Sequence, residues 1–362
     1  MAFSYLESKC PTAKRGIVIL IDPPSAHYFN NLFFELSSPL NRDNTLRVNF
    51  ELKVSLEEAG YPVFTADFYR QIADQYPGSE FHYWSFGAPA ERALNFSGNN
   101  VKKKGAVLFE PPLVKPNDYK KIEFLLFEFD HVFLHNVVGD GYHLPPPRFA
   151  KKMVKFYWTN KNFQGAEANN HLNERRAKIA LIAGAHFAKA LPENGYGKRL
   201  DAIRNFGFNG DLDLFGFGWG KLQFRSPLSS ILWLLRMRLA NKSIPNPVRK
   251  YDVYQRYDFA LCFENMAMCG YITEKIFDAL FAKSIPIYWG APDISEYIPS
   301  DCFVALNDFE DMKACFDYCL NLTDREKAIY RASIERFLSS DKFARFSSGI
   351  HGHIFDLYTV RK

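Results

Sequence analysis

The pattern of apolar and polar positions is clearest in residues 257–309. Residues 259–263, 285–288 and 303–306 are short apolar runs bounded by proline, glycine or aspartate, which is typical of buried strands. Between the first two runs, residues 272–282 repeat apolar side chains at helical spacing. This alternation of strand, helix and strand predicts a parallel sheet with helical crossovers.

The rest of the chain alternates in the same way, apart from residues 67–104. That segment is rich in aromatic and turn-forming residues, and we expect it to be irregular. A basic first turn opens the helix expected at 198–205, which suggests an anion there, because cations at a helix N-terminus oppose its dipole. The other expected strands are 16–21, 62–66, 105–109, 131–135, 153–157, 178–185 and 213–215, and the other expected helices are 48–59, 118–128, 310–320 and 323–338. The last helix opens with the capping-box sequence Thr323-Asp324-Arg325-Glu326.

Length and composition predict two α/β domains. The 362 residues have room for two domains of ordinary size, and the polar stretch at 160–177 lies between two alternating halves. We therefore expect an N-terminal Rossmann-like domain at 1–165, a second one at 166–340 and a C-terminal tail at 341–362.

Composition and charge narrow the class of protein. A hydrophobic content of 47% argues against disorder, and a net charge of +5 is compatible with anionic ligands but does not suggest general nucleic-acid binding. The N-terminus is no signal peptide, and no apolar run is long enough to span a membrane. We expect a cytoplasmic protein. Residues 229–240 predict either a domain-packing helix or a peripheral contact with the inner membrane face.

The six cysteines show neither a CxxC pair nor a repeated spacing. Cys315 and Cys319 lie four apart on an expected helix, which is too weak a signal for a zinc site. We expect reduced, structural thiols, as in a reducing compartment.

Polar residues gather between the strand at 259–263 and the helix that follows it. They stand at the carboxyl end of a strand and before a helix N-terminus, where open α/β sheets bind ligands. Lys275 adds positive charge for a phosphate, whereas the carboxylate of Glu274 suits the hydroxyls of a ribose or sugar. The arrangement predicts a nucleotide-diphosphate site.

These residues also carry a resemblance to a known family. The sequences FEN at 263–265, GYITEK at 270–275, IPIYWG at 285–290 and YIP at 297–299 resemble the donor-site signature of the α1,3/α1,4-fucosyltransferases, glycosyltransferase family 10. The resemblance is dense over 257–309 and thins upstream. It implies a GT-B fold, with two Rossmann-like domains facing a cleft and GDP-fucose held by the second domain.

The resemblance also implies roles for individual residues. Arg199 and Lys275 would neutralise the diphosphate leaving group, and Lys250 would either contact the donor or only cover the domain. The donor would also be held by Asn265, Tyr271 and Glu274. Glu264 has the plainer interpretation of capping its loop.

Glu110 ends an apolar strand immediately before Pro111 and Pro112. The plain interpretation is an ordinary loop carboxylate. An inverting sugar transfer needs a general base, which is usually Glu or Asp, and the family places a Glu after a strand of the first domain. Its Gly-Glu-Asn context is replaced here by Phe-Glu-Pro-Pro. We select Glu110 as the base, with Glu128, Asp130 and Asp140 as rivals.

The expected activity is that of a bacterial-type inverting α1,3-fucosyltransferase. Fucose would pass from GDP-fucose to the 3-OH of an N-acetylglucosamine or glucose unit of an oligosaccharide. No obligate metal or cofactor is expected, since no DxD signature ends a strand of the donor segment. The alternatives are a GT-B transferase that uses another sugar nucleotide and a non-catalytic relative that binds a nucleotide or glycan. The sequence does not indicate the oligomeric state.

Overall fold

The computed structural model describes residues 13, 15–87, 90–159, 175–186, 193–207, 210–219, 231 and 249–360. The chain forms two compact units, one made of Met1–Tyr157 with Ser348–Lys362 and the other of Trp158–Ser347. The predicted boundary at 165 and 166 lies outside the described residues, as does all but one residue of the predicted helix 229–240.

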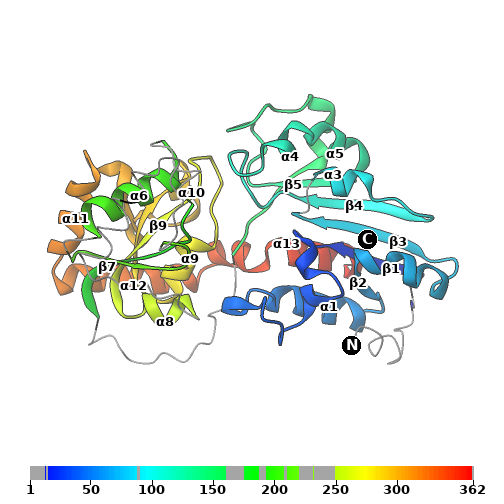
Figure 1. Cartoon of the computed structure of the whole chain (residues 1–362), viewed down its shortest axis with the longest axis horizontal. Helices are drawn as coiled ribbons and strands as arrows, with labels where there is room; N and C mark the ends of the chain where they lie inside the picture. Colours follow the sequence, from blue (N-terminus) through cyan, green and yellow to red (C-terminus); the bar gives the residue numbers. More distant parts are fainter. Residues whose placement is uncertain are drawn as a thin grey trace. The chain divides into compact units, whose positions relative to one another are not determined.

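The first unit is built on a six-stranded sheet in which every pair of neighbouring strands is parallel. Its strands lie in the order β2-β1-β3-β4-β5-β6 (Figure 1). The bounds are β1 Ile17–Asp22, β2 Val63–Thr65, β3 Glu80–Phe86, β4 Val101–Val107, β5 His131–Leu134 and β6 Met153–Lys155. Five of these strands match predicted ones, with β4 starting four residues early.

The prediction of an irregular segment at 67–104 is wrong. It contains β3, an inner strand of the sheet, together with the first residues of β4. Both faces of β3 are covered, because Tyr83 and Trp84 are each fully buried although they point to opposite faces. A strand buried on both sides shows no alternation of polar and apolar residues, so its pattern resembles an aromatic loop.

The longer helices of the first unit agree with the predictions only in part. The helix predicted at 48–59 is α1 (Arg47–Glu58), but the one predicted at 118–128 is two short helices, α4 (Pro116–Lys120) and α5 (Ile122–Glu128). Lys121, between them, has a ψ of 11°, which breaks the helix. The remaining short elements are α2 Tyr69–Ile72, α3 Ala90–Asn95, η1 Ala26–Tyr28, η2 Leu32–Phe34, η3 Arg42–Asn44, η4 Ala66–Phe68, η5 Ala73–Gln75 and η6 Pro147–Lys152.

The segment expected as a C-terminal tail is helical. Helix α13 spans Asp341–Thr359 and is interrupted at Gly349, whose φ of 48° and ψ of −154° are not helical. Beyond Gly349 the helix belongs to the first unit, where the Tyr358 hydroxyl contacts His82 Nδ1 at 2.8 Å and accepts a hydrogen bond from Trp84 Nε1 at 3.0 Å. The C-terminal part of α13 is therefore tied to β3 of the first sheet.

The second unit is built on a five-stranded sheet with the order β11-β10-β9-β7-β8, again parallel throughout. Its strands are β7 Arg176–Ile182, β8 Leu212–Phe215, β9 Tyr257–Phe263, β10 Ile285–Trp289 and β11 Val304–Ala305. The predicted strand–helix–strand unit at 257–309 is confirmed. The helices are α6 Gly195–Phe206, α8 Lys250–Tyr254, α9 Glu274–Phe281, α10 Ile294–Tyr297, α11 Met312–Asn321 and α12 Asp324–Leu338, with short helical turns η9 Ser300–Cys302 and η10 Leu306–Asp308.

Helices cover both faces of the second sheet (Figure 1). Helices α6 and α11 pack on one face, where Ile203 and Phe316 join the apolar core, and α9 and α12 pack on the other. The capping box predicted at Thr323 is present and opens α12. Among the described helices, none combines the length and the apolar character that crossing a membrane requires.

Candidate functional site

The candidate site lies at the carboxyl ends of β7 and β9, two neighbouring strands of the second sheet. From β7 the chain passes through α6 to β8 on one side, and later returns to β9 on the other side. The strand order therefore reverses between β7 and β9, and ligands of open α/β sheets bind at such a point. The predicted donor-site residues follow β9, and Arg199 lies on α6.

Glu264 is the first residue after β9 and is fully buried. Its Oε1 accepts a hydrogen bond from the backbone N–H of Thr273 at 2.7 Å, and its Oε2 accepts one from the Thr273 hydroxyl at 2.8 Å. Thr273 is the N-cap of α9, so the carboxylate ties the strand end to the helix start. The predicted loop-capping role of Glu264 is confirmed.

Lys275 lies in the first turn of α9, within reach of two carboxylates. Its ammonium Nζ donates to Glu264 Oε2 at 3.1 Å and to the Thr273 hydroxyl at 2.8 Å, and stands 3.7 Å from Glu274 Oε1. Burial by itself would lower the pKa of Lys275, but the negative charges of Glu264 and Glu274 raise it above its usual value. A quarter of the side chain is exposed, so a charged ligand can reach it.

Glu274 opens α9 beside two cations. Burial by itself would raise the pKa of this carboxyl, yet the ammonium groups of Lys275 and Lys250 lower it to about 2. Glu274 is therefore ionised at neutral pH. As an acceptor-only carboxylate it can bind the hydroxyls of a sugar, which agrees with its predicted role.

Arg199 projects from α6 toward the end of β9. Its Nη2 donates to Asn265 Oδ1 at 2.7 Å, and its guanidinium lies over the ring of Tyr196, 4.8 Å from the centroid. The side chain is 8% exposed and its buried Nε has no hydrogen-bond partner. Burial lowers the pKa of Arg199, but an arginine stays charged in proteins. The structure thus brings Arg199 and Asn265 together, as their predicted roles require.

The start of α6 differs from the prediction. The helix begins at Gly195 rather than at 198, with Asn194 as N-cap accepting from the backbone N–H of Gly197 at 3.0 Å. Arg199 therefore lies in the second turn, and the expected basic first turn does not exist in that form. Gly195 is required here, because a Cβ on it would lie 1.6 Å from the carbonyl oxygen of Glu264.

Lys250 and Tyr271, also predicted to bind the donor, are engaged within the protein. Lys250 Nζ donates to Asp278 Oδ2 at 2.8 Å and so joins α8 to α9. Tyr271 is 1% exposed and forms part of the interior. The structure favours the plainer interpretation of Lys250, in which it covers the domain.

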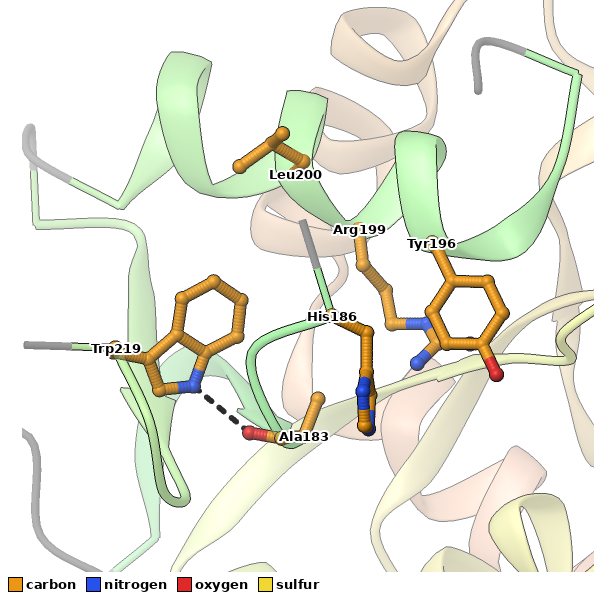
Figure 2. Close-up of a pocket in the computed structure, with 7 residues that line it drawn as sticks. Ala183, His186, Tyr196, Arg199, Leu200 and Trp219 are labelled. Carbon is orange, nitrogen blue, oxygen red and sulfur yellow. Dashed lines mark hydrogen bonds between the residues drawn. The ribbon is translucent and has the colours of Figure 1, made fainter. Parts of the chain in front are cut away.

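A pocket of about 260 Å³, part of it open to solvent, lies beside Arg199 (Figure 2). Figure 2 shows His186 and Tyr196 close to Arg199, and Trp219 across the pocket with its Nε1 donating to Ala183 O at 2.8 Å. Of these residues, only Arg199 was predicted from the sequence to bind a ligand. Their positions could have indicated a ligand site, because His186 follows β7, Trp219 follows β8 and Tyr196 lies at the start of α6.

Glu110 lies at the carboxyl end of the first sheet, three residues after β4, and is partly exposed. Its carbonyl oxygen accepts a hydrogen bond from the Tyr119 hydroxyl at 3.1 Å. Asp140 follows β5 at the same edge. Glu128 and Asp130 precede β5 and pair with Lys103 and Lys104, so they lie at the opposite edge. Of the three alternative candidates for the base, only Asp140 therefore lies at the same end of the sheet as Glu110.

The sequence pattern also did not predict a charged pair at the carboxyl end of the first sheet, where Glu110 lies. Asp22 ends β1 and is buried, and it binds Arg92 through Nε at 3.0 Å and Nη2 at 2.7 Å. The Tyr83 hydroxyl donates to the same carboxylate at 2.6 Å. Because these partners are distant in sequence, no local motif predicts their contacts. Within the described part of the chain, no cluster of three or more His, Cys, Asp or Glu side chains could hold a metal ion.

Comparison with known proteins matches part of the second unit. Residues 239–335 match the model for the C-terminal region of glycosyltransferase family 10, the fucosyltransferases. This segment of the chain is similar to members of that family, and the match covers about a quarter of the chain. The match to the family 10 model contains the network of Glu264, Thr273 and Lys275.

Two named fucosyltransferases match over short segments. An α-(1,3)-fucosyltransferase of Helicobacter pylori is 40% identical over 83 residues, which cover 23% of this chain and 17% of that protein. The human GDP-fucose protein O-fucosyltransferase 3 is 29% identical over 107 residues, which cover 27% of this chain and 22% of that protein. The matched segment thus spans about a fifth of the length of these relatives. The first is named for an α-(1,3) linkage and the second for protein O-fucosylation.

A solved structure extends the likeness in fold to nearly the whole chain. WaaG, a glycosyltransferase involved in lipopolysaccharide biosynthesis, aligns over 95% of this chain and 99% of its own, with a TM-score of 0.51 and 9% identity. The predicted GT-B fold, with two Rossmann-like domains, is confirmed.

Proposed function

We propose that the protein is an inverting fucosyltransferase that moves L-fucose from GDP-fucose to a hydroxyl group of an oligosaccharide. The observation that supports it most is the convergence of Arg199 and Lys275 at the point between β7 and β9, within a segment that matches family 10. A buried arginine and a partly exposed lysine at the carboxyl end of the sheet suit the diphosphate of a sugar nucleotide.

In the proposed reaction the acceptor oxygen attacks the anomeric carbon of the β-linked donor. Glu110 takes the proton of the attacking hydroxyl as general base. The bond between fucose and the diphosphate breaks, and GDP leaves with its developing charge stabilised by Arg199 and Lys275. Attack from the face opposite GDP produces an α-fucoside. The proposed acceptor is the 3-OH of N-acetylglucosamine or glucose, and the names of two α-(1,3)-fucosyltransferases among the relatives support the position of the linkage.

The donor hydroxyls are assigned to Glu274, and the nucleotide or sugar to Asn265. Glu274 is charged and lies at the start of α9, beside the lysine proposed to hold the diphosphate. Tyr271 and Lys250 would support these residues without direct contact with the donor. Tyr271 is buried, and Lys250 is bound to Asp278.

The first experiment is a calorimetric titration of the protein with GDP, GDP-fucose, GDP-mannose and UDP-galactose, without added metal. We expect micromolar binding of the guanosine nucleotides and much weaker binding of UDP-galactose. Preference for the uridine nucleotide would favour a GT-B transferase with another donor. Tight GDP binding without transfer to lactose or N-acetyllactosamine would favour a non-catalytic relative, and no nucleotide binding would contradict the proposal.

A further inference from the structure

Glu264 has contacts that exceed what loop capping needs. Its carboxylate is fully buried and has three hydrogen-bond donors, of which one is the ammonium of Lys275 at 3.1 Å. A buried carboxylate is costly unless it is paired and hydrogen-bonded, so this position is built around the charge.

The surrounding backbone makes room for that carboxylate. A Cβ on Gly290, at the end of β10, would lie 2.6 Å from Glu264 Cγ, and a Cβ on Gly195 would lie 1.6 Å from the Glu264 carbonyl oxygen. The backbone N–H of Glu264 donates to Trp289 O at 2.8 Å. The ends of β9 and β10 and the starts of α6 and α9 therefore converge on one residue, Glu264.

The Thr273 hydroxyl links the carboxylate to the lysine. It donates to Glu264 Oε2 at 2.8 Å and accepts from Lys275 Nζ at 2.8 Å. Although Thr273 is the N-cap residue of α9, its side chain makes no capping hydrogen bond to the helix backbone. Instead of capping the helix backbone, as an N-cap threonine usually does, the Thr273 hydroxyl accepts the hydrogen bond of Lys275.

We infer that Glu264 is a positioning residue that fixes Lys275 Nζ beside the N-terminus of α9 and keeps it charged for a diphosphate ligand. The inference deepens the proposed function and rests on it for the identity of the ligand. The groups that face Lys275 are Glu264 from β9, Glu274 from its own helix and Arg199 from α6. Of these three charged groups, the two carboxylates stabilise the ammonium, and Glu264 is the one that accepts a hydrogen bond from it.

The first test measures Lys275 without a ligand. Amines of the full chain are labelled with limiting acetic anhydride between pH 7 and 11, and the peptide containing Lys275 is quantified by mass spectrometry. In Glu264→Gln we expect the labelling curve of Lys275 to move at least one pH unit lower, about a tenfold faster reaction at pH 9. Lys313, an exposed lysine on α11, is the internal standard and should not change.

The second test measures GDP affinity by calorimetry over the same pH range. In Glu264→Gln the affinity should begin to fall about one pH unit lower than in the unmodified protein. The ionisation of GDP is common to both proteins and cancels in their ratio. In a Lys275→Ala background, Glu264→Gln should leave the pH dependence of GDP binding unchanged, because the lysine on which it acts is missing. Glu335→Gln, which removes a carboxylate paired with Lys283 on the surface, is the matched control.

The outcomes separate this inference from the proposed function. Unchanged labelling of Lys275 in a folded Glu264→Gln protein would overturn the inference, as would an equal loss of GDP affinity with and without Lys275. Failure of the unmodified protein to bind GDP would overturn the proposed function, while the labelling curves would still decide the role of Glu264. If thermal unfolding shows that Glu264→Gln is not folded, Thr273→Val replaces it, with a smaller shift expected in the same direction and no shift counting against the inference.

Discussion

The carboxyl edges of the two sheets hold their charges in different ways. At the carboxyl end of the second sheet, the cations Arg199 and Lys275 have partners, Asn265 and Glu264, that belong to one short segment after β9. At the edge of the first sheet, Asp22 and Arg92 satisfy each other, and Glu110 stands partly exposed after β4.

This difference corresponds to two kinds of task. A site for a diphosphate needs several cations held at fixed positions, and a contiguous motif supplies their partners. A general base needs one carboxylate at the right place, and many loops can present it. The candidate site at the carboxyl end of the second sheet can therefore be recognised from sequence. The candidate base at the carboxyl end of the first sheet has to be tested residue by residue.

The largest expected effect is that of Glu110→Gln. If Glu110 is the base, transfer of fucose to N-acetyllactosamine or lactose should fall by about 10²- to 10⁴-fold. GDP binding should not change, since the substitution lies in the other unit. Transfer is followed by the release of GDP, with Asp140→Asn and Glu128→Gln measured in parallel. A larger loss in Asp140→Asn would move the role of base to that residue.

Lys275→Ala should cause the next largest effect. Loss of a charge-assisted hydrogen bond of about 1.5–3 kcal/mol should weaken GDP binding about tenfold to a hundredfold. Calorimetry measures the change, with Lys313→Ala on α11 as an exposed control that should bind GDP normally. Equal affinity in both variants would show that the second edge does not hold the diphosphate through Lys275.

Arg199→Lys should have a smaller effect, about fivefold to tenfold on GDP affinity, because lysine keeps the charge but loses the planar fork that binds Asn265 and a phosphate together. Arg204→Lys, on the exposed side of the same helix, is the matched control. An undiminished affinity in Arg199→Lys would mean that only its charge matters.

The smallest effect concerns acid stability. The pKa of Glu274 is about 2 in the folded protein against an ordinary value of 4.5, so its ion pairs stabilise the fold above about pH 4.5. That stabilisation is lost as the pH falls from about 4.5 toward 2. Glu274→Gln should therefore be less stable near neutral pH and lose less stability over that range. Chemical unfolding at several pH values measures it, and parallel curves for the two proteins would contradict the assignment.

Errors in the sequence analysis have identifiable physical causes. Strand β3 was missed because both of its faces are buried and its residues do not alternate. The predicted tail proved to be helix α13, whose end is held by contacts of Tyr358 with His82 and Trp84, more than 270 residues earlier in the chain. Such long-range contacts leave no local pattern.

The sequence by itself determined the parallel strand–helix alternation and the likeness of residues 257–309 to family 10, because these depend on local spacing and on a contiguous motif. Only the tertiary structure decided which charges meet. Arg199 is hydrogen-bonded to Asn265, Lys250 to Asp278, and Lys275 to the buried Glu264. Glu128 and Asp130 lie at the end of the first sheet opposite to Glu110. These partners are chosen by the order of strands in a sheet and by the close approach of backbones at glycines, neither of which a local pattern encodes.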